Sequence, residues 1–172
     1  VRIHTRVPVV DSQRIDDEML AALHLFPRAV YVALHANHPR ELTAQARAAC
    51  ARLIDSGIAM VSQSVLLRGV NDNADVLADL MRAFVEMRIK PYYLHHPDLA
   101  PGTAHLRVSI EEGQRLVRQL LGRVSGLCQP AYVLDIPGGF GKSPIGPSYL
   151  RQNGDGYEVE DFQSGLHHYR DG

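Results

Sequence analysis

The stretch that decides the fold is Tyr132-Val133-Leu134-Asp135-Ile136-Pro137-Gly138-Gly139-Phe140-Gly141-Lys142, an apolar run that ends in an aspartate before a glycine-rich turn and one lysine. Glycine adopts positive φ without a Cβ clash, so backbone N–H groups in such a turn can approach an anion closely. The Lys142 amine can pair with phosphate, or attack a carbonyl where its ammonium is partly desolvated. A nucleotide P-loop is excluded, because Ile136 stands where its first glycine is required and Pro144 follows too soon for a long helix.

On the N-terminal side of this stretch, apolar strands alternate with amphipathic helical patterns. We predict strands at 2–10, 29–35, 59–67, 91–95 and 131–136, and helices at 15–25, 41–56, 74–88 and 109–122. Helix starts are marked by Thr43 or Glu41, by Asn71-Asp72-Asn73, and by Ser109, with Glu112 completing a capping box. Alternation of this kind predicts an α/β fold with a parallel sheet, in which 29–35, 59–67 and 91–95 are adjacent.

The pattern changes after about residue 150. Residues 151–156 read as a turn between two short strands, and 161–172 as a tail. We therefore divide the chain into a main domain, 1–150, and a short C-terminal extension, 151–172.

Composition narrows the class of protein. The 172 residues carry a net charge of −1, which does not indicate nucleic acid or an anionic membrane as a partner. No apolar run approaches the roughly 20 residues of a membrane-spanning helix. Cys50 and Cys128 are too few for a disulfide scaffold and suit a reducing, cytoplasmic compartment. The chain starts at Val1 inside a strand pattern, as expected of a fragment of a longer protein.

Polar residues cluster where the predicted strands end: His35-Ala36-Asn37-His38, Gln63-Ser64, His95-His96-Pro97-Asp98 and Asp135. In a barrel or an open α/β sheet, ligands bind at the C-terminal ends of the strands. Four strands that present polar residues at that end predict one functional site.

The residue types alone leave its chemistry open. The histidines and Asp98 could hold Zn²⁺ in a barrel hydrolase, or could only cap strands and loops. Asp98 and Asp135 could together hold an ammonium group, or each could cap a loop. Lys142 could form a Schiff base with an aldehyde cofactor such as pyridoxal phosphate, or lie on the surface.

Ordered motifs along the chain carry a family resemblance. They are Arg6-Val-Pro-Val-Val10, His35-Ala-Asn-His-Pro39, Gln63-Ser-Val-Leu-Leu67, Val70-Asn-Asp72, Pro91-Tyr-Tyr-Leu94, Asp98-Leu, Gly102-Thr-Ala-His105 and Asp135-Ile-Pro-Gly-Gly-Phe-Gly-Lys142. Together they resemble the C-terminal half of the lysine 2,3-aminomutase family over residues 1 to about 150. These are isomerases of the radical S-adenosylmethionine (SAM) class that also use pyridoxal phosphate.

The resemblance implies part of an incomplete (βα) TIM-like barrel and a 1,2-amino shift that interconverts L-lysine and β-lysine. In the family, a 4Fe–4S cluster cleaves SAM to a radical, and pyridoxal phosphate carries the migrating nitrogen. By position, Lys142 resembles the lysine that binds pyridoxal phosphate, and Asp98 and Asp135 resemble the carboxylates that hold the distal ammonium of the substrate. His35 and Gln63 resemble residues of the SAM site.

The resemblance also bears on substrate specificity. Two aspartates suit a cationic side chain, whereas a relative acting on glutamate would need a basic or neutral group there. Another relative modifies a lysine of a translation elongation factor and tends to have glutamate in place of Asp135. The Asp135-Ile-Pro-Gly-Gly form favours free L-lysine as the substrate.

The chain departs from the family at several points. The C-x-x-x-C-x-x-C cluster motif is absent, so the cluster ligands are expected outside this chain, and the isolated chain is expected to be inactive. A zinc ligand of some members matches Asn73, so we expect no metal in this chain. His95 stands where a tyrosine is common. Members of the family form oligomers.

Overall fold

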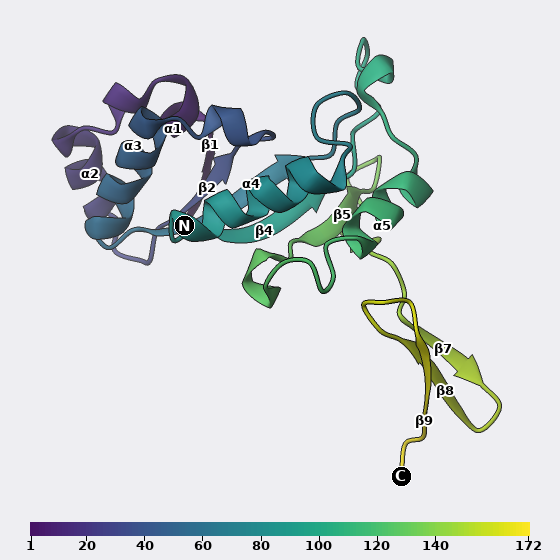
Figure 1. The fold of residues 1–172 in the computed structure, drawn as a ribbon. Coiled ribbons are helices and arrows are strands. Elements are labelled where there is room, and N and C mark those ends of the chain that lie inside the picture. Colours follow the sequence, from purple (N-terminus) through teal and green to yellow (C-terminus); the bar gives the residue numbers. More distant parts are fainter.

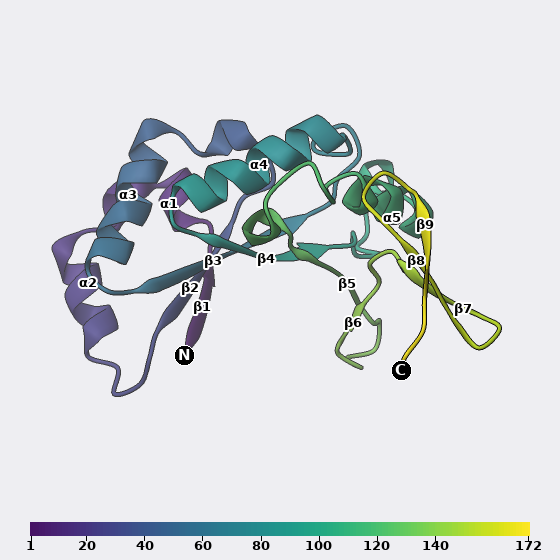
Figure 2. The same cartoon turned by 60° about the horizontal axis from the view of Figure 1, so that its bottom comes forward.

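The computed structural model describes residues 1–172, and its main body is a six-stranded sheet with helices on one face (Figure 1, Figure 2). The strands follow the chain order in space: β1 (Arg2–Thr5), β2 (Tyr31–His35), β3 (Ala59–Val65), β4 (Lys90–His95), β5 (Ala131–Asp135) and β6 (Lys142–Pro144). The first five are parallel and β6 is antiparallel to β5. The predicted α/β class and the adjacency of 29–35, 59–67 and 91–95 are therefore confirmed.

The helices connect successive parallel strands, because parallel neighbours in a sheet need a crossover connection. Their bounds are α1 (Val7–Val10), α2 (Asp17–His24), α3 (Ala44–Asp55), α4 (Ala74–Glu86) and α5 (Ile110–Arg118). Three start as their sequences predict, because Thr43, Asn73 and Ser109 each accept a hydrogen bond from a first-turn N–H. The capping box at Ser109 is incomplete, since the Glu112 carboxylate contacts Arg68 instead (3.3 Å).

The hydrophobic core lies between the sheet and these helices. A cluster of 19 buried residues joins β2 and β3 to α2, α3 and α4, and a second cluster of nine joins α4 and α5 to β4 and β5. Alternate residues of each strand face this core, among them Leu34, Ser62, Ser64 and Tyr132. Their neighbours along the strand therefore point to the opposite face, which Figure 2 shows free of helices.

The predicted strand 2–10 is too long. β1 ends at Thr5, and α1 follows it with Pro8 in its first turn. Proline is accepted in a first helical turn because its missing N–H would have had no partner there. The apolar run Val7–Val10 therefore forms a short helix, in which only Pro8 is buried, and does not continue the strand.

The C-terminal extension forms its own antiparallel sheet of β7 (Leu150–Asn153), β8 (Gly156–Glu160) and β9 (Leu166–Tyr169). A turn between two short strands is present as predicted, but it is confined to 154–155, because residues 151–153 belong to β7. The predicted tail is wrong, because β9 pairs with β8. The extension contacts α5 through Arg118, which pairs with Glu160 (2.5 Å) and lies over the Tyr149 ring. None of the helices is long and apolar enough to cross a membrane.

Candidate functional site at the strand ends

Strand register brings the predicted site residues to one face and one end of the sheet. His35 is the direct partner of Gln63, and His95 pairs with Val65 on one side and with Val133 on the other. Asp135 lies two residues beyond Val133 and so points the same way. These residues alternate with Ser62, Ser64 and Tyr132, which face the helices. The site therefore lies on the helix-free face, at the carboxyl ends of β2 to β5.

The glycine-rich stretch closes a hairpin between β5 and β6. Gly138, Gly139 and Gly141 all have positive φ (93°, 82° and 92°), and the loop is closed by a hydrogen bond from Ile136 N to Gly141 O (2.8 Å). In the hairpin Asp135 lies directly opposite Lys142, so both side chains are on one face. The Lys142 ammonium accordingly forms an ion pair with Asp135 Oδ1.

His95 contacts the second oxygen of the same carboxylate. Its Nδ1 lies 2.8 Å from Asp135 Oδ2, and the residue is 5% exposed at the end of β4. Burial lowers the pKa of His95, and the hydrogen bond to Asp135 only partly opposes this. For Asp135, burial acts to raise the pKa, but the bonds from Lys142 and His95 outweigh it and hold the pKa below its usual range. The aspartate is therefore ionised and held by two neighbouring strands.

His35 and Gln63, expected at the SAM site, lie side by side at the ends of β2 and β3. His35 Nε2 is 3.3 Å from His4 Nδ1, and burial together with the nearby His4 and His95 lowers the pKa of His35. The Gln63 Oε1 is buried and has no hydrogen-bond partner within the chain. A neutral imidazole beside an unpaired amide oxygen suits a polar organic ligand that offers hydrogen-bond donors.

Asp98 does not join the ion pair. It is exposed in the loop after β4 and forms no hydrogen bond or ion pair with another residue, although its negative charge is near enough to oppose slightly the lowering of the His95 pKa. The structure thus brings Asp135 and Lys142 together and leaves Asp98 at the margin of the same site.

Lys142 is one of only two lysines in the chain. The other, Lys90, is at the opposite end of β4, where its ammonium donates to the backbone carbonyls of Leu127 (2.8 Å) and Gln129 (3.0 Å). Lys142 is therefore the chain's only amine-bearing side chain at the strand ends.

The histidines singled out as zinc ligands do not converge. His38 Nδ1 accepts a hydrogen bond from Arg40 N (3.1 Å) and caps a short 3-10 helix, while His95 is bonded to Asp135. No group of three or more His, Cys, Asp or Glu side chains is placed to hold a metal ion. Cys50 and Cys128 are both buried in the hydrophobic core, and two cysteines are fewer than the ligands of an iron–sulfur cluster.

Two asparagines near the strand ends have a structural role that the sequence did not reveal. The buried Asn71 side chain accepts from Leu67 N (2.7 Å) and donates to the carbonyls of Asn37 (2.8 Å) and Val65 (2.9 Å). Asn37 Oδ1 in turn accepts from Val65 N (2.9 Å). These bonds connect the β2 and β3 ends and fix the loops on which the site depends. Asn37 belongs to a polar cluster at a predicted strand end, and Asn71 to a predicted helix start. Their spacing in the sequence does not distinguish a residue that bonds to backbone groups from one that binds a ligand.

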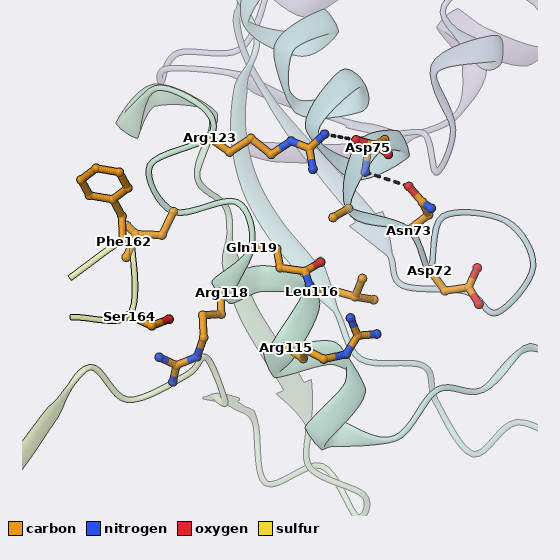
Figure 3. Close-up of a pocket in the computed structure, with 12 residues that line it drawn as sticks. Asp72, Asn73, Asp75, Arg115, Leu116, Arg118, Gln119, Arg123, Phe162 and Ser164 are labelled. Carbon is orange, nitrogen blue, oxygen red and sulfur yellow. Dashed lines mark hydrogen bonds and ion pairs between the residues drawn. The ribbon is translucent and has the colours of Figure 1, made fainter. Parts of the chain in front are cut away.

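A hollow of about 730 Å³ lies elsewhere, between the start of α4, α5 and the C-terminal extension (Figure 3). Two of its arginines are already paired, Arg123 with Asp75 across the hollow and Arg118 with Glu160, which lies outside the lining. It contains none of the predicted site residues. The strand ends, where a buried histidine, a carboxylate and an amine meet, are the better candidate.

Known proteins agree with this architecture. No family model matches the chain. A radical SAM methyltransferase from Sphaerobacter thermophilus has a similar fold, with a TM-score of 0.53 and 19% sequence identity over 78% of this chain and 39% of that one. The chain thus shares the fold of part of that enzyme, which agrees with the predicted incomplete (βα) barrel.

Sequence comparison identifies nearer relatives. L-lysine 2,3-aminomutases of Acetoanaerobium sticklandii and Clostridium subterminale are each 42% identical over 150 residues, which is 87% of this chain and 36% of theirs. Glutamate 2,3-aminomutase of Clostridioides difficile is 36% identical over 91% of this chain and 37% of its own. The chain is therefore a homologue of the lysine 2,3-aminomutase family over most of its length, and the predicted resemblance is confirmed. It spans little more than a third of the length of these relatives.

Proposed function

We propose that this chain is the substrate-binding part of an isomerase that moves the α-amino group of L-lysine to the β carbon. The observation that carries the proposal is the Asp135–Lys142 pair, a carboxylate and an amine held opposite each other at the strand ends. The relatives named L-lysine 2,3-aminomutase support the reaction class.

The sign of the charge at Asp135 favours lysine over glutamate as the substrate. Opposite charges about 4 Å apart attract by about 4 kcal/mol at an effective dielectric constant near 20, and like charges repel by the same amount. An ionised Asp135 therefore attracts the distal ammonium of lysine and repels the carboxylate of glutamate. Asp98, at the margin of the site, adds a second negative charge that acts in the same direction.

The residues present fit pyridoxal phosphate. Lys142 offers an amine on the helix-free face, and the three glycines before it leave backbone N–H groups accessible in an exposed loop. A Cβ built at Gly139 or Gly141 would meet nothing within 4 Å, so the space beside the loop is open. When bound, the cofactor supplies an aldehyde for the amino group and a conjugated ring that stabilises an unpaired electron.

The residues that would bind the other two cofactors, SAM and the 4Fe–4S cluster, are expected in different parts of the protein. His35 and Gln63 fit the SAM site, because the unpartnered Gln63 oxygen and the neutral His35 ring can bind polar groups of that molecule. The 4Fe–4S cluster does not fit this chain, and its ligands belong to residues outside it. The radical chemistry thus depends on the whole protein.

Borohydride reduction tests the cofactor assignment. Full-length protein loaded with pyridoxal phosphate and then reduced should carry the label on Lys142, identified by peptide mass. Lys90 is an internal control, because its ammonium is already bound to two carbonyls. Label on Lys90, or on no residue of this chain, would contradict the assignment.

A further inference from the structure

His95, Asp135 and Lys142 form a continuous chain of contacts across three neighbouring strands. His95 Nδ1 contacts Asp135 Oδ2 at 2.8 Å, and Lys142 Nζ contacts the other oxygen, Oδ1. The carboxylate is thus held from both sides, by a ring on β4 and an amine on β6. Only one of the two contacts, that with His95, comes from a buried group.

The contacts determine where the protons are. An ionised carboxylate only accepts hydrogen bonds. The Nδ1 atom of His95 must therefore carry a proton and donate the hydrogen bond to Asp135. Burial disfavours the charged imidazolium, which leaves the opposite nitrogen, Nε2, without a proton. That Nε2 atom is buried and has no hydrogen-bond partner within the chain. His95 is therefore a neutral donor with a single defined tautomer.

The surroundings hold the ring in this orientation. His95 lies between Val65 and Val133 in the sheet register, and the Tyr93 ring meets it edge-on, with centroids 5.6 Å apart. The charged and titratable groups near it are Asp135 on β5, Lys142 on β6, Asp98 on the following loop and His35 on β2. Among these groups, Asp135 is the one whose side chain forms a hydrogen bond with the His95 ring.

We propose that His95 is a positioning residue: its Nδ1–H fixes the Asp135 carboxylate so that Oδ1 is presented to a cation, and so sets the preference for a cationic substrate. This inference rests on the proposed function, in which that cation is the distal ammonium of L-lysine. In the present structure, Lys142 is the cation that Oδ1 contacts. A residue that makes no contact with the reacting atoms would thereby contribute to specificity.

Two variants separate the donor from the bulk of the side chain. His95→Asn keeps a side-chain N–H close to the position of Nδ1, whereas His95→Leu fills similar space without a donor. The full-length protein is loaded with pyridoxal phosphate but not with SAM, so that no turnover occurs. It is then titrated with L-lysine and with L-norleucine, an analogue that lacks the distal ammonium. Binding is read from the cofactor absorbance. Borohydride labelling of Lys142 shows that each variant carries its cofactor.

We expect His95→Leu to weaken L-lysine binding about tenfold to a hundredfold, the range for a hydrogen bond to a charged group. His95→Asn should recover most of this loss, and L-norleucine binding should change less than threefold in both variants. With SAM added, the loss should fall on KM rather than on kcat.

The pH dependence gives a readout that a purely structural residue would not change. Below the usual histidine range, protonation of His95 places a positive charge beside Asp135, so L-lysine binding to the natural protein should weaken. His95→Asn lacks this group and should show a shallower decline. His35, Asp98 and Lys142 are present in both proteins, so their contributions cancel in the comparison.

The outcomes separate the two proposals. If the natural protein neither labels at Lys142 nor converts L-lysine, the proposed function is wrong and this inference falls with it. If the natural protein does both, then unchanged L-lysine binding in His95→Leu, or equal losses for L-lysine and L-norleucine, overturns the role of His95 alone. Should His95→Leu fail to fold, an unaltered pH profile in His95→Asn is the result that overturns it.

Discussion

Changing Asp135 to asparagine removes one negative charge from the strand ends while keeping the size of the side chain and one oxygen acceptor. The bare attraction between the carboxylate and a substrate ammonium at 4 Å is about 4 kcal/mol at an effective dielectric constant of 20. The Asp135 side chain is 35% exposed, so solvent screens part of this attraction. We therefore expect a loss of roughly 2–3 kcal/mol, the value of a charge-assisted hydrogen bond, or about 30- to 150-fold in kcat/KM.

The assay is the conversion of L-lysine by the full-length protein supplied with the three proposed cofactors. Asp161→Asn is a matched control, because Asp161 also pairs with a histidine, His167 (2.6 Å), but lies in the C-terminal extension. It should leave kcat/KM unchanged. Because Asp135 also contacts Lys142, the borohydride label on Lys142 must be shown to persist in Asp135→Asn. If that label persists and kcat/KM falls by less than about threefold, the carboxylate does not hold the substrate cation.

Three further predictions concern stability. Gly113→Ala should lower the free energy of unfolding by about 1–3 kcal/mol, because the new Cβ would lie 1.9 Å from Tyr132 Oη. Its control, Gly126→Ala, places the Cβ in open space and should change the free energy of unfolding by less than about 0.5 kcal/mol. Equal effects of the two variants in denaturant titrations would contradict this prediction. Asn71→Leu should cost about 3 kcal/mol or more in the same titrations, because it leaves three half-buried backbone groups unpaired. A cost below about 1 kcal/mol would show that water replaces these bonds. Burial lowers the pKa of His96, so the unfolded chain binds more protons than the folded chain in mildly acidic solution. Stability should therefore fall as the pH drops below about 6.5. Between about pH 7 and pH 5, the melting temperature of His96→Asn should fall less than that of the natural protein.

Much of the fold could be predicted because local signals agreed with the tertiary structure. Thr43, Asn73 and Ser109 are N-caps in the sequence and in the structure, and they fix the starts of three helices. The two errors have physical causes. Val7–Val10 is too short for its periodicity to distinguish a helix from a strand. Residues 166–169 alternate weakly and are all exposed, so their strand depends on pairing with β8 rather than on burial.

The site could be predicted only as far as strand ends could be located. Asp135 and Lys142 were expected near each other because one short loop joins them. The contact between His95 and Asp135 could not be predicted, because it joins residues 40 positions apart and depends on the β4–β5 register. The placement of Asp98 depends on an irregular loop, for which the sequence offers no periodicity. The roles of Asp98, Asp135, His35 and Gln63 in binding stay predictions.

Because Asp135 pairs with Lys142 across the hairpin, the number of residues in the intervening turn matters for function. Side chains alternate between the two faces of a strand, so the addition or removal of one residue between positions 136 and 141 would rotate the amine to the far side of the hairpin. Substitutions in this turn can therefore be tolerated where insertions and deletions cannot. Attempts to change the proposed preference for L-lysine should alter side chains around the turn and conserve its residue count.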